Sequence, residues 1–173
     1  KTNMGITALM GVAGIELALW DIKGKALGQP IYRLLGGPFR ERQRVYWSHL
    51  ASYRAYWSDD GKHWERTGVE PLLTWDDLVE SVHTALSAGY TAFKTNLIFP
   101  GAPPRSMSMT PRSDSYQRGL SSVLLDHAVK QISVMREAAG PDVDICLDTN
   151  VNFDTEGARR LARASSWRAA STG

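Results

Sequence analysis

The sequence predicts an α/β fold made of parallel βαβ units. Three strand-like runs, 44–53, 90–96 and 143–148, alternate with segments of helical periodicity. The loops that follow these strands are long and those that precede them are short, which is typical of parallel units. The run 143–148 is nearly all apolar, as strands covered on both faces are. Three such units are too few to close a parallel barrel of eight strands, so the pattern predicts part of a TIM-type (β/α) barrel.

Composition limits the class of protein. With 173 residues, 43% of them hydrophobic, the chain can form one domain or part of a larger one. Its 20 basic and 18 acidic residues are spread along the chain, which indicates neither a nucleic acid nor an anionic membrane as partner. The single cysteine, Cys146, excludes an intramolecular disulfide and is expected to be a buried thiol. Glu16 and Asp21 interrupt the apolar stretch 5–22, so we expect a cytoplasmic protein without signal peptide or membrane span.

The first third of the chain is predicted to be helical and then extended. Apolar residues at helical spacing over 6–26 predict a helix that is buried on more than one side. Glycine and proline at 28–30 break it, and a short turn of helix over 31–35 ends at 36–38. The run 44–53 alternates as a strand does, and 55–71 is expected to be a long loop.

The remaining elements follow the same signals. Thr74 is a good N-cap for a helix that reaches residue 88, with its apolar stripe at Leu78, Val82 and Leu86. The proline-rich segment 99–119 is expected to be a loop. A helix over 120–139 should turn one face inward, a third helix should occupy 155–163, and 164–173 has no recognisable periodicity. The inward face of the helix 120–139 is expected to carry Val129, Ile132 and Met135.

Polar residues stand where each predicted strand ends. Ser48 and His49 end the first, Lys94 and Asn96 the second, and Asp148 the third. Carboxyl ends of parallel strands are where α/β proteins place ligands and hard cations, so these side chains could converge on one site. A turn aspartate and a lysine that extends into solvent are the alternatives at Asp148 and Lys94. His63, His83 and His127 have no metal-ligand spacing, and solvated or capping roles are favoured for the two in helices, His83 and His127.

One longer motif resembles a known family. The run GIELALWDIKGKALGQPIYRLLGG at 14–37 resembles the segment that links the capping domain to the barrel in the enolase superfamily, in its mandelate racemase and muconate lactonizing branch. Residues 5–163 keep the order of that family. The resemblance implies that 1–43 is the end of an α+β capping domain with its linker helix. It also implies that 44–163 forms the first three βα units of the barrel, and that 164–173 is an aberrant or truncated tail.

The resemblance implies roles for single residues. Asp148 would be the first of three acidic Mg²⁺ ligands, and Asn150 would lie beside the substrate as in mandelate racemases. Lys94 matches the first lysine of the family's K-x-K motif and would be catalytic, facing a substrate carboxylate. Asn96 stands at the second lysine and cannot act as a general base. With Ser48 and His49, it remains a candidate for substrate binding.

The implied chemistry is abstraction of a proton α to a carboxylate, with Mg²⁺ as cofactor. Because Asn96 replaces a lysine base, a His-Asp dyad on later strands is expected instead, which favours dehydration of a sugar acid. A racemase, a cycloisomerase and a catalytically inactive truncated fragment are the alternatives. A fragment would expose apolar strand edges and self-associate, and members of the family often form homo-oligomers.

Overall fold

The computed structural model describes residues 4–55, 63–107, 119–150 and 152–169. The chain divides into two compact units, 1–44 and 45–173, which are described separately below. None of the helices in the described part of the chain is both long and apolar enough to span a membrane.

The first unit contains helix α1 (Met4–Leu27) and the single turn α2 (Ile31–Leu34), which confirms both predicted helices. The predicted burial of the long helix is wrong within this unit. Among its described residues, 4–44, α2 is the helix that packs on α1, and it is one turn long. The large apolar side chains of α1 are therefore more than half exposed: Leu9, Met10, Val12, Ile15, Leu17, Leu19, Ile22 and Leu27.

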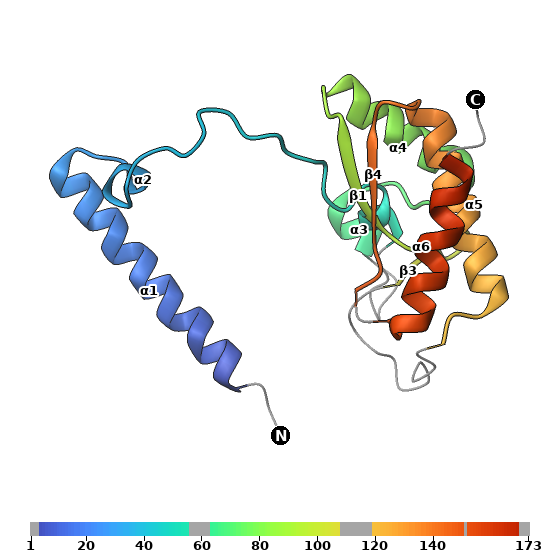
Figure 1. The fold of residues 1–173 in the computed structure, drawn as a ribbon, viewed down its shortest axis with the longest axis horizontal. Coiled ribbons are helices and arrows are strands. Elements are labelled where there is room, and N and C mark those ends of the chain that lie inside the picture. Colours follow the sequence, from blue (N-terminus) through green and yellow to red (C-terminus); the bar gives the residue numbers. More distant parts are fainter. Residues whose placement is uncertain (1–3, 56–62, 108–118, 151, 170–173) are drawn as a thin grey trace. The chain divides into compact units, whose positions relative to one another are not determined.

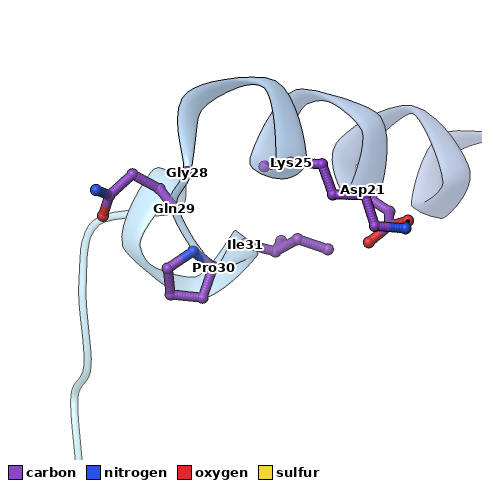
Figure 2. A pocket seen from close by; sticks show the side chains of 7 residues that line it. Asp21, Lys25, Gly28, Gln29, Pro30 and Ile31 are labelled. Carbon is purple, nitrogen blue, oxygen red and sulfur yellow. Dashed lines mark hydrogen bonds and ion pairs between the residues drawn. The ribbon is translucent and has the colours of Figure 1, made fainter.

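A tight corner joins the two helices. Gly28 adopts a left-handed φ of 61°, which ends α1 at low steric cost. The Gln29 N–H donates to the Gly24 carbonyl at 2.9 Å, and a Cβ on Gly24 would lie 2.8 Å from the Gln29 oxygen. A pocket of about 300 Å³ lies at this corner. Figure 2 shows its lining, which includes Lys25 and Asp21, the two members of an exposed ion pair. None of the predicted site residues lines it.

A parallel pair of strands organises the second unit. Strands β1 (Ala92–Asn96) and β4 (Asp144–Asp148) pair in parallel, which confirms the predicted mixture of helices with a small parallel sheet (Figure 1). In their register Lys94 is opposite Cys146, and Asn96 is opposite Asp148. A short antiparallel pair, β2 (Ile98–Phe99) and β3 (Arg105–Ser106), follows β1 within the predicted loop 99–119, whose residues 108–118 lie outside the described part.

The strand expected over 44–53 is reduced to one parallel bridge, between Trp47 and Phe93. The chain leaves the extended conformation because His49 and Ala51 adopt left-handed φ values of 57° and 58°, and it continues into the 3₁₀ helix η1 (Ser52–Ala55). Three backbone hydrogen bonds of 2.8–2.9 Å still tie Trp47 and Leu50 to β1. This short segment therefore flanks β1 on the side opposite to β4.

Three helices cover one face of this sheet: α4 (Trp75–Ser87), α5 (Ser122–Ala139) and α6 (Thr155–Ala169). A short helix, α3 (His63–Thr67), precedes them in the chain. Helix α5 packs against both α4 and α6 (Figure 1). Helix α3 lies in the predicted loop 55–71, whose residues 56–62 are outside the described part. The expectation that 164–173 lacks helical structure is wrong as far as Ala169, because α6 continues through that residue.

The hydrophobic core lies between β1 and helices α4 and α5. Phe93, Leu78, Val82 and Met135 are fully buried in it, which confirms the predicted stripe of α4 in part. The inward face of α5 differs from the prediction, since Val129 and Ile132 are half-buried. The buried positions of α5 are instead Ala128, Gln131 and Met135. Gln131 faces inward because it bonds to the backbone of Asn96, at the end of β1, and of Ile98, just after it.

The other face of the sheet is open along β4. Side chains alternate along a strand, so Lys94, Asn96, Cys146 and Asp148 share the face opposite to Phe93. Cys146 is exposed, and its predicted burial is wrong because none of the described helices covers this face at β4. The polar side chains of both strand ends therefore lie together on a surface that a ligand can reach.

Helix α4 begins with a capping box that makes stability depend on pH. Thr74 Oγ1 accepts from the Asp77 N–H at 3.3 Å, and Asp77 Oδ2 accepts from the Thr74 and Leu73 N–H groups at 2.7 and 2.8 Å. Partial burial would raise the Asp77 pKa, but these hydrogen bonds and the charge of Arg54 outweigh it and hold the pKa below its ordinary value.

A carboxylate with a lowered folded-state pKa stabilises the fold at neutral pH and loses that contribution as pH falls through the folded value. We expect the free energy of unfolding of the wild-type chain to fall below about pH 4, and Asp77→Asn to lack this component. Chemical denaturation between about pH 2 and 7 measures it. Asp76 accepts none of these hydrogen bonds, so Asp76→Asn should retain the wild-type dependence, and equal curves for all three proteins would contradict the assignment.

Candidate active site

The centre of the site is an ion pair between two neighbouring strands. Lys94 Nζ lies 3.2 Å from Asp148 Oδ2, and the two side chains are 26% and 33% exposed. Lys94 is in the middle of β1, two residues before its end, and Asp148 is the last residue of β4. Because the strands are parallel, their carboxyl ends meet at one edge, and the two groups point from the open face toward that edge.

Asn96 connects this ion pair to the turn that carries His49. The Asn96 Nδ2 donates to the Asp148 backbone oxygen at 3.2 Å, and its Oδ1 lies 3.3 Å from His49 Nδ1. Asn96 is 5% exposed, whereas His49 is exposed. Ser52 Oγ is 3.5 Å from the same His49 nitrogen. Two left-handed non-glycine residues in one turn are uncommon, and such strain is concentrated at ligand sites.

Asn150 organises the loop that follows β4. Its backbone N–H donates to Asp148 Oδ1 at 2.9 Å, an Asx-type turn, and it adopts a left-handed φ of 51°. Its side-chain Nδ2 donates to the Met107 carbonyl at 3.2 Å. The loop after β4 is thereby tied to the segment that follows β3.

The electrostatics of the ion pair favour its charged form. The pKa of the Asp148 carboxyl lies below its ordinary value, first because it accepts the Asn150 N–H and further because of Lys94, while desolvation opposes the shift. The hydrogen bond from Lys94 to Asp148 raises the pKa of the ammonium. Asp148 is therefore an anion at neutral pH and Lys94 a cation, as a metal ligand and an anion-binding group must be.

The structure brings together most of the residues predicted from strand ends. Lys94, Asn96, Asp148, His49 and Asn150 are linked by the contacts above. Ser48 lies in the same turn with an exposed side chain, and the structure shows no hydrogen bond from it to those five residues.

The discounted histidines have different positions. His83 is exposed on α4, and His63 begins α3. His127 is half-buried, stacks on Phe99 and lies 2.7 Å from the Ile98 carbonyl, so the expectation of a solvated or capping role is wrong for it.

Sequence reasoning missed the residues that support the site. Tyr46 places its ring 5.7 Å from Lys94 Nζ, within cation–π distance. Buried Gln131 bonds to the backbone of Asn96 and Ile98, and buried Arg54 bonds to α4 beside the His49 turn. Tyr46 could have been found from strand alternation. The side chains of Gln131 and Arg54 bond to residues 16 or more positions away, for which no local pattern is a signal.

The donor chemistry of Asp148 fits one ligand of a hard cation, because an ionised carboxylate at an accessible strand end is what Mg²⁺ prefers. In the described part of the chain, no group of three or more His, Cys, Asp or Glu side chains is arranged to hold a metal ion. Among the described residues, Asp148 therefore fits as one of several ligands of a metal site.

Fold and site together define the class of protein. It is an α/β protein in which a cation and a carboxylate form a pair at the carboxyl edge of a parallel sheet. Residues 2–36 match the family model of the mandelate racemase and muconate lactonizing enzyme N-terminal domain. A D-galactonate dehydratase of Variovorax paradoxus (strain S110) is 32% identical over 160 residues, 92% of this chain and 32% of that relative.

Solved structures agree. A Salmonella enterica serovar Typhimurium protein described as a dehydratase is 33% identical, with a TM-score of 0.67 over 86% of this chain and 34% of that one. A Burkholderia xenovorans (strain LB400) protein described as an L-alanine-DL-glutamate epimerase, bound to magnesium and fumarate, has a TM-score of 0.71 at 29% identity, over 88% of this chain and 37% of that one.

The chain is similar to proteins of the mandelate racemase and muconate lactonizing branch of the enolase superfamily, and among them to sugar acid dehydratases. It spans about a third of the length of the curated relatives it matches.

Proposed function

We propose that the protein acts as a magnesium-dependent sugar acid dehydratase, with these 173 residues contributing one part of its active site. The observation that carries the proposal is the Lys94 and Asp148 pair at the adjoining ends of parallel strands. Relatives named D-galactonate dehydratase support the reaction class. Because those relatives are about three times as long, the proposal concerns the activity of the whole protein.

Each residue has a role in this proposal. Asp148 would hold Mg²⁺ through its ionised carboxylate, as one of several oxygen ligands. A bound Mg²⁺ acts as a Lewis acid on a substrate carboxylate and makes the neighbouring C–H more acidic. Lys94 would bind that same carboxylate and neutralise negative charge that develops during proton abstraction. The structural neighbour with magnesium and fumarate supports a carboxylate and a metal as ligands of this fold.

Asn96 favours dehydration over racemisation and cycloisomerisation. An amide is neither an acid nor a base at neutral pH, so no lysine base acts from this position. Racemisation needs two opposed bases, and the amide of Asn96 can serve as neither of them. We propose that the base and the remaining metal ligands lie outside the described residues.

Metal binding is the first test. Titration of the chain with Mg²⁺, followed by calorimetry and by amide chemical shifts near residues 148 and 150, should show saturable binding with a dissociation constant on the order of 1 mM. Asp148→Asn should remove the binding. Asp144 lies at the other end of the same strand, so Asp144→Asn should leave it unchanged. Loss of binding in both variants would contradict the placement of the site.

Turnover is the second test. We expect the chain, saturated with Mg²⁺, to convert D-galactonate to its 2-keto-3-deoxy product only if it carries a complete site. Product formation that Asp148→Asn and Lys94→Met each abolish would support an active dehydratase. A folded chain that binds Mg²⁺ and forms no product would instead support the catalytically inactive fragment.

A further inference from the structure

The two oxygens of the Asp148 carboxylate have different partners. Oδ1 accepts the backbone N–H of Asn150 at 2.9 Å, whereas Oδ2 lies 3.2 Å from Lys94 Nζ. The hydrogen bond from Asn150 closes a turn within the loop after β4, and so it fixes the rotation of the carboxylate. Oδ2 is therefore the oxygen that Asp148 turns toward Lys94 on the open face of the sheet.

A metal ion held at Oδ2 would meet the ammonium of Lys94. A carboxylate oxygen has lone pairs for more than one partner, so the number of acceptor sites does not exclude both. Charge opposes it, because Mg²⁺ carries two positive charges, the ammonium carries one, and the single negative charge of Asp148 cannot neutralise all three. The ion and Lys94 are therefore competing partners of the same oxygen.

Lys94 can leave Asp148 without leaving the open face. Its side chain is 26% exposed, and a lysine ammonium stands on a flexible stem of four carbons. The ring of Tyr46 lies 5.7 Å from Nζ, on the segment that flanks β1 on the side opposite to β4. A tyrosine ring attracts a cation at this distance. An ammonium that is displaced from Asp148 thus keeps a second partner within reach of the site.

We propose that Lys94 and Mg²⁺ compete for Asp148 Oδ2, and that displacement from Asp148 makes the Lys94 ammonium available to the carboxylate of the substrate. Without the metal ion, Lys94 and Asp148 neutralise each other. The ion pair thereby sets an order of binding, in which the metal ion precedes the acid. This proposal rests on the proposed function, in which Asp148 holds Mg²⁺ and Lys94 binds the acid.

Calorimetric titration with Mg²⁺ tests the competition. Lys94→Met removes the competing charge and should tighten binding about tenfold. Lys130 provides the matched control, because it is exposed on α5, on the covered side of the sheet, with Nζ 5.0 Å from the ring centroid of Trp75. Lys130→Met removes the same charge and a similar ring contact, and it should leave the affinity unchanged.

The other outcomes of this titration are distinct. Equal or weaker binding in Lys94→Met, or equal tightening in both variants, overturns the competition and leaves the proposed function standing. Absence of binding in the wild-type chain and in Lys94→Met overturns the competition and also counts against the proposed function. Binding in Lys94→Met alone supports the competition.

The ¹H–¹⁵N signals of the lysine ammonium groups test the displacement itself. Asp148→Asn provides the signal of a Lys94 ammonium that lacks its carboxylate partner. Saturating Mg²⁺ should move the wild-type Lys94 signal toward that reference, while the Lys130 signal stays in place as evidence that the fold is intact. A Lys94 signal that does not move, under conditions where calorimetry shows binding, overturns the proposal.

Addition of D-galactonate tests the order of binding. The Lys94 ammonium signal should respond to D-galactonate only when Mg²⁺ is present. An equal response without Mg²⁺ overturns the order and leaves the proposed function standing. Displacement by Mg²⁺ without any response to D-galactonate supports the competition, but it overturns the contact between Lys94 and the acid, here and in the proposed function.

Discussion

Replacing Arg54 with methionine is expected to lower the free energy of unfolding by about 3 kcal/mol, because a buried guanidinium that donates to three acceptors is lost. The Arg54 side chain is 10% exposed. Its Nε donates to the Glu70 carbonyl, and its Nη1 donates to the Asp77 carbonyl and to Ser81 Oγ, all at 3.0 Å. Methionine has a similar length and fills the space without any donor. The loss therefore reports hydrogen bonds more than cavity formation.

The ion pairs of Arg54 contribute less to this figure. Glu80 is 70% exposed and Asp77 27% exposed, so water screens both carboxylates. Arg54→Lys keeps the charge but cannot reproduce the planar set of donors, and it should recover only part of the stability. Arg159 provides the matched control, since it pairs with Glu156 at the surface, where both side chains are more than half exposed.

Urea denaturation of the variants measures the difference. Arg159→Met should change the free energy of unfolding by no more than about 0.5 kcal/mol. Similar losses for Arg54→Met and Arg159→Met would contradict the role given to the buried guanidinium. Since η1 continues directly from the His49 turn, the Arg54 variant should also move the amide signals of that turn.

The site residues were predictable from sequence because the signal is local. Strand alternation places Lys94 and Asn96 on one face, and the end of an apolar run marks Asp148. Parallel pairing then brings these positions together without further information. The exposure of Cys146 was not predictable in this way. An apolar strand indicates that both of its faces are covered, but it does not show whether the described residues supply the covering elements.

The first strand failed for a different reason. Residues 44–53 alternate well, but His49 and Ala51 adopt left-handed conformations, which histidine signals weakly and alanine does not signal. These conformations are held by distant contacts: Leu50 donates to the Lys94 carbonyl, and Thr95 Oγ1 donates to the Leu50 carbonyl at 2.7 Å. Tertiary hydrogen bonds thus override the local preference for a strand. The position of His49 beside Asn96 could come only from the structure.

Replacing Gln131 with leucine should cost about 1–3 kcal/mol, since it leaves the buried Ile98 N–H without this acceptor and removes one of two donors to the Asn96 carbonyl, which also accepts from Thr95 Oγ1. Gln131 is fully buried in α5. Its Oε1 accepts from the Ile98 N–H at 3.0 Å, and its Nε2 donates to the Asn96 carbonyl at 2.8 Å. The backbone just after β1 therefore completes its hydrogen bonding through a helix side chain. Leucine fills a similar volume, and its apolar gain offsets part of the cost.

Gln131→Glu separates the two bonds, because a carboxylate still accepts from Ile98 but cannot donate to Asn96. Ser133→Ala, two residues along the same helix, removes only a bond to the preceding turn and should cost under about 0.5 kcal/mol. Urea denaturation measures stability, and amide shifts at Asn96 and Asp148 measure the site. If the leucine variant matches Ser133→Ala in stability and leaves the Asn96 signal in place, α5 does not hold this end of β1. If the Asn96 signal moves together with that of His49, the link from α5 to the candidate active site is direct.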